Sequence, residues 1–109
     1  MEGFSVKKGL IICAGGMSSS LLAKKVSEYF ASKGEEIIVE ATGIGEGAQA
    51  IEDDKYDVYL VSPQTKMHYE RLAKSAKNHD KSIVNIPPQA YVPIPTGIQK
   101  LATVVEENI

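Results

Sequence analysis

The chain has 109 residues, of which 43% are hydrophobic and 24% charged, with a formal net charge of −2 at neutral pH. This size and composition predict one globular domain. The charge balance, with Arg71 as the sole arginine, gives no basic surface for nucleic acid. The apolar runs are far shorter than the roughly 20 residues that span a bilayer. A single cysteine allows no internal disulfide and favours a reducing cytoplasm.

The first part of the chain predicts a strand, a turn and a helix. Residues 1–8 are expected to form a polar lead-in without an apolar signal segment, and residues 9–109 the domain. The apolar run Gly9–Cys13 is typical of a strand buried on both faces. A helix capped by Ser18 or a neighbour follows, and Gly34 is expected to end it in the left-handed conformation.

The rest of the chain alternates between short apolar strands and helices. Strands are predicted at Ile37–Val39, Val58–Val61 and Ile83–Ile86. Helices are predicted after a glycine-rich turn at Thr42–Gly47, from Ser62-Pro63 onward, and around Ile98–Val105, which an extended loop at Pro87–Pro95 precedes. This alternation indicates a parallel sheet with helices on both faces. With strand order 2-1-3-4, the turns after strands one, three and four would meet beside Cys13.

Cys13 stands where the first strand ends and is followed by Gly-Gly-Met-Ser-Ser-Ser and the predicted helix. A helix N-terminus stabilises anions and favours a thiolate over a thiol. The glycines allow backbone N–H groups to approach a ligand, and serine hydroxyls can donate hydrogen bonds. The pattern therefore predicts a nucleophilic cysteine in a phosphate-binding loop. The alternative, a merely buried cysteine, would need no serine-rich loop.

Two chemistries use a cysteine in a phosphate loop. A cysteine phosphatase of the low-molecular-weight tyrosine phosphatase type has the pattern Cys-x5-Arg-Ser, but Ser19 occupies the arginine position here. The guanidinium that would clamp the phosphoryl oxygens is missing. The loop Pro87–Pro95 also contains no Asp or Glu to act as general acid. Both absences argue against hydrolysis and favour a phosphocysteine that survives until a partner takes the group.

The segment Cys13–Leu22, Cys-x-x-Gly-Met-Ser-Ser-Ser-Leu-Leu, resembles the active-site loop of the lactose/cellobiose-type IIB components of the bacterial phosphoenolpyruvate-dependent sugar phosphotransferase system. Ser62-Pro63-Gln64 resembles the family's Gly-Pro-Gln after the third strand. Tyr91, with Gly97 six residues later, resembles its Tyr-Gly-x-x-x-Gly region. The resemblance extends from Gly9 onward. The chain departs from the pattern at Ser62 and Val92, which replace glycines, and at Thr96, which replaces an aspartate.

This resemblance implies a single-domain α/β fold like that of low-molecular-weight tyrosine phosphatase. It also implies a cytoplasmic phosphotransferase, peripheral to the membrane, in which Cys13 takes a phosphoryl group from a phosphohistidine of a IIA component. Cys13 would pass the group to a sugar held by a membrane IIC component during uptake. The sugar would be a β-linked disaccharide such as cellobiose, lactose or chitobiose. The implied intermediate is a covalent phosphocysteine, with no other cofactor, no metal and no nucleic acid.

The resemblance further implies which residues surround the phosphate. The phosphate-binding residues would be Ala14, Gly15, Gly16, Met17, Ser18, Ser19 and Ser20, through backbone N–H groups and the hydroxyls of Ser18 and Ser20. The candidate lid or partner contacts are Pro63, Gln64 and Tyr91.

Other interpretations stay open from the sequence. A cysteine phosphatase or arsenate reductase would release phosphate, and a plain binding module would hold phosphate or a nucleotide without transferring it. The segment Gly43–Ala48 matches the relaxed dinucleotide pattern G-x-G-x-x-A, but the chain supplies too few strands for a dinucleotide fold. His68 and His79 have no further ligand at a suitable spacing, so we expect them to be solvated rather than metal-binding.

Overall fold

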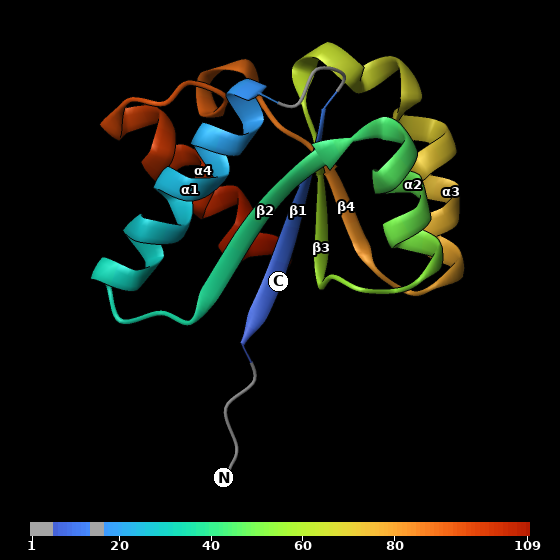
Figure 1. Cartoon of the computed structure of the whole chain (residues 1–109), viewed down its shortest axis with the longest axis horizontal. Coiled ribbons are helices and arrows are strands. Elements are labelled where there is room, and N and C mark those ends of the chain that lie inside the picture. The colour runs from blue at the N-terminus through green and yellow to red at the C-terminus, as the bar shows by residue number, and fades with distance from the viewer. Residues whose placement is uncertain (1–5, 14–16) are drawn as a thin grey trace, which may run out of the picture.

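The computed structural model describes residues 6–13 and 17–109. Its sheet is parallel, with the strand order β2-β1-β3-β4. The elements in chain order are β1 (Lys7–Cys13), α1 (Met17–Ser32), β2 (Ile37–Gly43), α2 (Ile44–Glu52), β3 (Val58–Val61), the 3-10 helix η1 (Pro63–His68), α3 (Tyr69–Asn78), β4 (Ser82–Asn85), the 3-10 helix η2 (Pro88–Ala90) and α4 (Pro95–Asn108). Helices α1 and α4 lie on one side of the sheet, and α2 and α3 on the other (Figure 1). The predicted fold class and strand order are confirmed.

Two apolar clusters, one on each face of the sheet, form the core. Successive residues of a strand point to opposite faces, and β1 supplies both clusters: Ile11 packs with α1 and α4, and Ile12 with α2 and α3. The residues from Gly9 to Cys13 are all buried, as the continuous apolar run predicts. Strand β1 is therefore enclosed on both faces, and its carboxyl end is held in place.

The first strand begins earlier than the sequence pattern predicts. Lys7 and Lys8 are paired in register with Ile37 and Ile38 of β2, although both lysine side chains are exposed. Their backbones are therefore part of the sheet, because pairing with a neighbouring strand does not require an apolar side chain. The predicted lead-in at 1–8 is wrong for these two residues, and positions 1–5 lie outside the described residues.

The glycine-rich segment Thr42–Gly47 is not the predicted turn. Strand β2 continues to Gly43 and α2 begins at Ile44, so Gly45 and Gly47 are helical. A Cβ at Gly47 would lie 2.8 to 3.0 Å from carbon atoms of the Ile12 side chain. Gly47 is therefore explained by the close approach of α2 to the sheet, an effect that local sequence does not reveal.

Helix α1 ends as predicted but begins earlier. Gly34 follows it with a φ of +77°, the left-handed conformation that glycine adopts without strain. The helix begins at Met17, so Ser18 lies within its first turn and not at the cap. The residue before Met17, which would be the cap, lies outside the described residues.

The segment between β4 and α4 is more structured than the predicted extended loop. Its proline-rich start forms η2, and α4 begins at Pro95, where a missing N–H costs nothing. The segment then lies directly against α4: a Cβ at Gly97 would overlap both the backbone carbonyl and the side chain of Val92. Gly97 therefore permits a contact that holds the loop close to the helix. The helix predicted from Ser62-Pro63 likewise begins as the 3-10 helix η1 before α3.

Strand β2 forms one edge of the sheet, and a helix side chain covers its middle. The Ser27 hydroxyl on α1 donates to the Val39 carbonyl oxygen at 3.1 Å and accepts from the Val39 N–H at 2.8 Å. Both backbone groups of an edge-strand residue are thus satisfied without a further strand.

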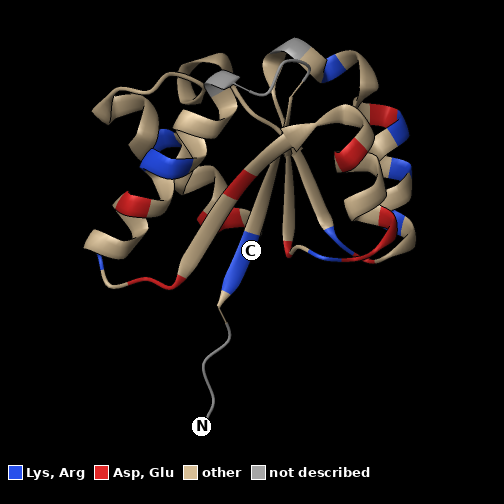
Figure 2. Cartoon of the chain, viewed as in Figure 1, with Lys and Arg blue, Asp and Glu red and all other residues tan. Residues whose placement is uncertain are grey.

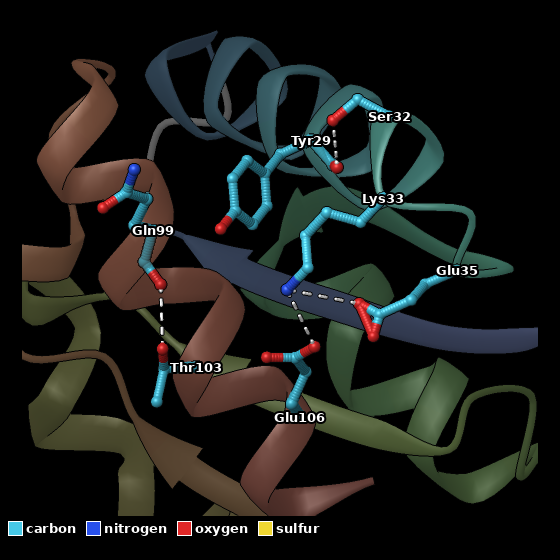
Figure 3. A network of polar contacts seen from close by, with 7 residues as sticks. All are labelled: Tyr29, Ser32, Lys33, Glu35, Gln99, Thr103 and Glu106. Atoms are coloured by element: carbon cyan, nitrogen blue, oxygen red, sulfur yellow. Dashed lines mark hydrogen bonds and ion pairs between the residues drawn. The ribbon is translucent and has the colours of Figure 1, made fainter.

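A group of charged residues, here called the ion cluster, links the end of α1 to the end of α4 (Figure 3). The Lys33 ammonium lies 3.7 Å from a Glu35 carboxylate oxygen and 3.5 Å from a Glu106 carboxylate oxygen. It also lies 5.1 Å from the centroid of the Tyr29 ring. Desolvation opposes the charge of Lys33, but attraction to Glu106 and Glu35 raises its pKa.

None of the helices in the described part of the chain is long and apolar enough to cross a membrane.

Candidate functional site

Cys13 is the last residue of β1, an inner strand of the sheet, and only 2% of its surface is exposed. Helix α1 begins four positions later at Met17 and has no acidic residue in its first turn. A helix of 16 residues places positive partial charge at this end, and an anion is stabilised there. The end of β1 and the start of α1 thus lie at the same end of the sheet (Figure 1).

The predicted phosphate-loop residues fall into two groups. Ala14, Gly15 and Gly16 lie outside the described residues. Met17, Ser18, Ser19 and Ser20 form the first turn of α1. Within this turn, Ser19 is fully buried and Ser20 is exposed. The two serines therefore face different surroundings: Ser19 can contact the interior of the site, and Ser20 the solvent.

Tyr91, which follows η2, extends its hydroxyl to the cysteine. The Tyr91 oxygen lies 3.2 Å from the Cys13 sulfur and 2.5 Å from the Ser19 hydroxyl oxygen. These contacts join residues that are 78 and 72 positions apart in the sequence. The loop after β4, the end of β1 and the start of α1 therefore meet at one point, as the strand order predicts.

Ser62, the residue after β3, lies close to this contact and is completely buried. Its backbone N–H donates to the Ile12 carbonyl at 3.0 Å, which continues the pairing of β3 with β1. Its hydroxyl lies 2.8 Å from the Thr65 hydroxyl, which donates to the same Ile12 carbonyl at 3.1 Å. Backbone and side-chain bonds therefore hold Ser62 in place beside Cys13.

The Ser62 hydroxyl is a further polar neighbour of the Tyr91 hydroxyl. Burial raises the pKa of Tyr91, and the hydrogen bond to Cys13 raises it further, whereas the hydroxyls of Ser19 and Ser62 lower it. We call Cys13, Ser19, Ser62 and Tyr91 the hydroxyl cluster. Sequence reasoning placed the turn that begins at Ser62 beside Cys13 but did not name Ser62 as a site residue. Its place after the strand next to β1 was the available signal.

The other residues singled out from the sequence lie in η1, in α3 or just after α3. Pro63 is half-buried at the start of η1, and Gln64 follows it. Arg71 is exposed on α3 beside His68, with 3.3 Å between their nitrogen atoms. His79 lies 3.8 Å from Glu52. Among residues 6–13 and 17–109, no group of three or more His, Cys, Asp or Glu side chains is placed to hold a metal ion.

The end of the molecule that carries Cys13 has few charged residues (Figure 2). Charged segments are concentrated along the helices and at the opposite end, apart from a basic segment in η1. A bound anion at the cysteine would therefore meet little repulsion from nearby carboxylates, and hydroxyl and N–H dipoles would supply most of its stabilisation.

Comparisons with known proteins agree on one family. The model of the lactose/cellobiose-specific IIB subunit of the phosphotransferase system matches residues 8–105. The oligo-beta-mannoside-specific EIIB component of Bacillus subtilis (strain 168) is 35% identical over 86 residues, which are 79% of this chain and 82% of that protein. The sequence match thus covers most of both proteins.

Two solved structures share the fold. The lactose-specific IIB domain of Streptococcus pneumoniae superposes with a TM-score of 0.82 at 22% identity, covering 95% of this chain and 98% of that one. The cellobiose-specific IIB component of Borrelia burgdorferi gives a TM-score of 0.74 at 24% identity, covering 97% and 94%. These IIB domains have a fold like that of low-molecular-weight tyrosine phosphatase.

IIB components are phosphotransferases, and they work with IIA and IIC components. The family model spans nearly the whole of this chain, and the Bacillus relative supports the same assignment from its sequence. The chain therefore belongs to the lactose/cellobiose-specific IIB family of the sugar phosphotransferase system.

Proposed function

We propose that this chain is a phosphocarrier that works through a phosphocysteine at Cys13. The observation that carries the proposal is the position of the Cys13 sulfur at the end of β1, beside the start of α1 and in contact with the Tyr91 hydroxyl. A thiolate is the nucleophilic form of cysteine, and a helix start together with hydrogen-bond donors favours it. The same groups suit a phosphoryl group once it is attached to sulfur.

The proposed reaction has two steps at the sulfur atom. In the first, the Cys13 thiolate attacks the phosphorus of a phosphohistidine on a IIA component. The P–N bond breaks, a P–S bond forms, and neutral imidazole leaves. In the second, a hydroxyl oxygen of the sugar at the IIC component attacks the phosphorus. The P–S bond breaks with its electron pair on sulfur, a P–O bond forms, and the hydroxyl proton passes to a base beside the sugar or to water.

A cysteine phosphatase or arsenate reductase is less well supported. Ser19 occupies the position of the phosphatase arginine and is engaged with Tyr91, whereas Arg71 is exposed on α3. Without a guanidinium at the loop, the charge that builds on the phosphoryl oxygens in hydrolysis would lack its usual bidentate partner. This arrangement favours transfer to a partner over release of phosphate.

For the sugar, we propose a β-linked disaccharide or short oligosaccharide. The similar Bacillus protein is named for oligo-beta-mannosides, and the two structural neighbours for lactose and cellobiose. Vesicles that contain the cognate IIC component, supplied with the phosphorylated chain, should phosphorylate at least one of mannobiose, cellobiose, lactose and chitobiose. Phosphorylation of monosaccharides alone would contradict this class.

Intact-mass spectrometry tests the carrier directly. The chain is incubated with phosphoenolpyruvate, the upstream phosphotransferase proteins and the cognate IIA component. One added phosphoryl group, mapped to Cys13 and absent without IIA, is the expected result. Cys13→Ser should remain folded, because the exchange is small, and should gain no phosphoryl group and support no sugar phosphorylation.

Two outcomes would contradict the proposal. One is a chain that stays unmodified although IIA itself is phosphorylated. The other is a Cys13→Ser variant that still supports sugar phosphorylation. Release of phosphate from an aryl phosphate by the wild-type chain would instead favour the phosphatase.

A further inference from the structure

The Tyr91 hydroxyl is bonded to both the cysteine sulfur and a serine hydroxyl. A phenol offers one donor and two acceptor lone pairs. The Tyr91 oxygen lies 3.2 Å from the Cys13 sulfur and 2.5 Å from the Ser19 hydroxyl oxygen. In one arrangement, Ser19 donates its proton to Tyr91, and the Tyr91 proton points at the sulfur. Tyr91 then serves as a donor to Cys13.

A second arrangement runs in the opposite direction. Tyr91 can instead donate to the Ser19 hydroxyl, since either oxygen of that pair could be the donor. The lone pairs of Tyr91 then accept from the Cys13 S–H group. This arrangement suits the neutral thiol, whereas the first suits the thiolate, which can only accept. Ionisation of Cys13 would thus require the hydroxyl protons of Tyr91 and Ser19 to reorient.

We propose that Tyr91 stabilises the Cys13 thiolate by donating a hydrogen bond to it, and that Ser19 acts as a positioning residue that directs this donor to the sulfur. The inference rests on the proposed phosphocysteine function and adds named residues to it. The three residues come from three separate segments: the end of β1, the first turn of α1 and the loop after η2.

This bond would act in both proposed steps. Before the first step, it increases the fraction of Cys13 that is thiolate. In the second step, negative charge returns to sulfur as the P–S bond breaks, and a donor already aimed at the sulfur stabilises that charge without reorganisation. A hydrogen bond to a charged group is worth about twice a neutral one. Tyr91 would therefore matter most when the sulfur is anionic.

The titration of Cys13 tests the proposal without any partner protein. The chain has one cysteine, so labelling with cysteine carrying 13C at Cβ gives a single NMR signal whose position against pH reports thiol ionisation. The variants are Tyr91→Phe and Ser19→Ala. Tyr69→Phe and Ser27→Ala are matched controls, because they remove a hydroxyl that bonds to backbone elsewhere in the fold.

Tyr91→Phe keeps the ring and is expected to move the titration midpoint upward by about one pH unit, or tenfold in the thiolate equilibrium. Ser19→Ala should move it upward by less. The double variant Tyr91→Phe/Ser19→Ala should match Tyr91→Phe alone, because Ser19 acts through Tyr91. The two control variants should keep the wild-type midpoint.

Three results would overturn the proposal. An unchanged midpoint in Tyr91→Phe would reduce Tyr91 to a packing residue. A downward shift would mean that the second arrangement, with Cys13 as donor, is the important one. Additive shifts in the double variant would mean that Ser19 acts on the sulfur without Tyr91.

The titration also separates this inference from the proposed function. If Tyr91→Phe shifts the midpoint but wild type gains no phosphoryl group from IIA, the carrier function fails and the thiolate contact stands. If wild type is phosphorylated and Tyr91→Phe leaves the midpoint unchanged, the carrier function stands and the role of Tyr91 fails.

Discussion

The hydroxyl cluster and the ion cluster lie at opposite ends of α1 and use different physics. Ser19, in the first turn of α1, is buried and contacts Tyr91 through a short, partly buried hydrogen bond between uncharged groups. Lys33, just after the last turn, contacts Glu106 of α4 through longer ion pairs between partly exposed side chains. Buried hydrogen bonds depend strongly on geometry, whereas exposed ion pairs tolerate displacement and are screened by salt. A small shift should therefore disrupt the first cluster and barely affect the second.

The largest expected effect comes from Gly97→Ala, which should displace the loop that carries Tyr91. The added Cβ would overlap the Val92 carbonyl, so the backbone next to Tyr91 must move. Overpacking of this kind typically costs about 1–3 kcal/mol. Chemical denaturation should show that loss, and the Cys13 titration should shift in the same direction as in Tyr91→Phe.

Gly45→Ala is the matched control for that experiment. Nothing lies within 4 Å of a Cβ built at Gly45, and this glycine is also helical. The variant should be as stable as wild type or slightly more stable, with an unchanged Cys13 midpoint. If Gly97→Ala also left the midpoint unchanged, the hydroxyl cluster would be less sensitive to displacement than the comparison requires.

Lys33→Met tests the other end and should have a smaller effect. Removing the ammonium abolishes both ion pairs and the contact with the Tyr29 ring. We expect a slight decrease in melting temperature at low salt, and convergence with wild type as salt is raised, because screening weakens the same pairs in wild type. Scanning calorimetry at two salt concentrations measures this. A large decrease in melting temperature that persisted in high salt would show that the ion cluster stabilises the fold more strongly than the comparison assumes.

Glu35→Gln should change the stability of the fold least of these variants, and the sign of that change is informative. A hydrogen bond with Glu106, burial and repulsion from Glu106 raise the pKa of Glu35, against the attraction of Lys33. The folded state therefore favours the protonated form: the contribution of Glu35 is fully present below its unfolded pKa and is lost as pH rises through the folded value. At neutral pH the glutamine variant should be at least as stable as wild type.

Urea unfolding of both proteins across the acidic range checks that sign. The difference between wild type and Glu35→Gln should shrink as pH falls below the ordinary range of a glutamate carboxyl. A variant that was less stable at neutral pH and equal to wild type in acid would mean that the pair with Lys33 outweighs the influence of Glu106.

Features of local origin were predictable from the sequence, and features of tertiary origin were not. Gly34 ends α1 as predicted, because the left-handed conformation found there depends on the residue type, and glycine adopts it without strain. The apolar run up to Cys13 and the alternation of elements were enough for a parallel sheet with the cysteine at the end of its first strand. Gly47 was mistaken for part of a turn, because its reason is a contact with Ile12 on another element.

The candidate site shows the same division. The Cys13 motif is continuous in the sequence, so it was found directly. The contacts of Tyr91 with Cys13 and Ser19 join residues more than seventy positions apart. Tyr91 was named as a candidate, but neither its bond to Ser19 nor the part of Ser62 follows from spacing. Only the packing of the loop after η2 against α4 brings these groups together.

The Ser27 hydroxyl that covers Val39 has a consequence for association. An open sheet edge is a template on which another chain can add a strand and begin aggregation. Here both backbone groups of Val39 are already bonded to Ser27, so an incoming strand would have to break two hydrogen bonds in the middle of β2. Strand addition at this edge would therefore cost these two hydrogen bonds, whereas binding through the helices and loops would leave them in place.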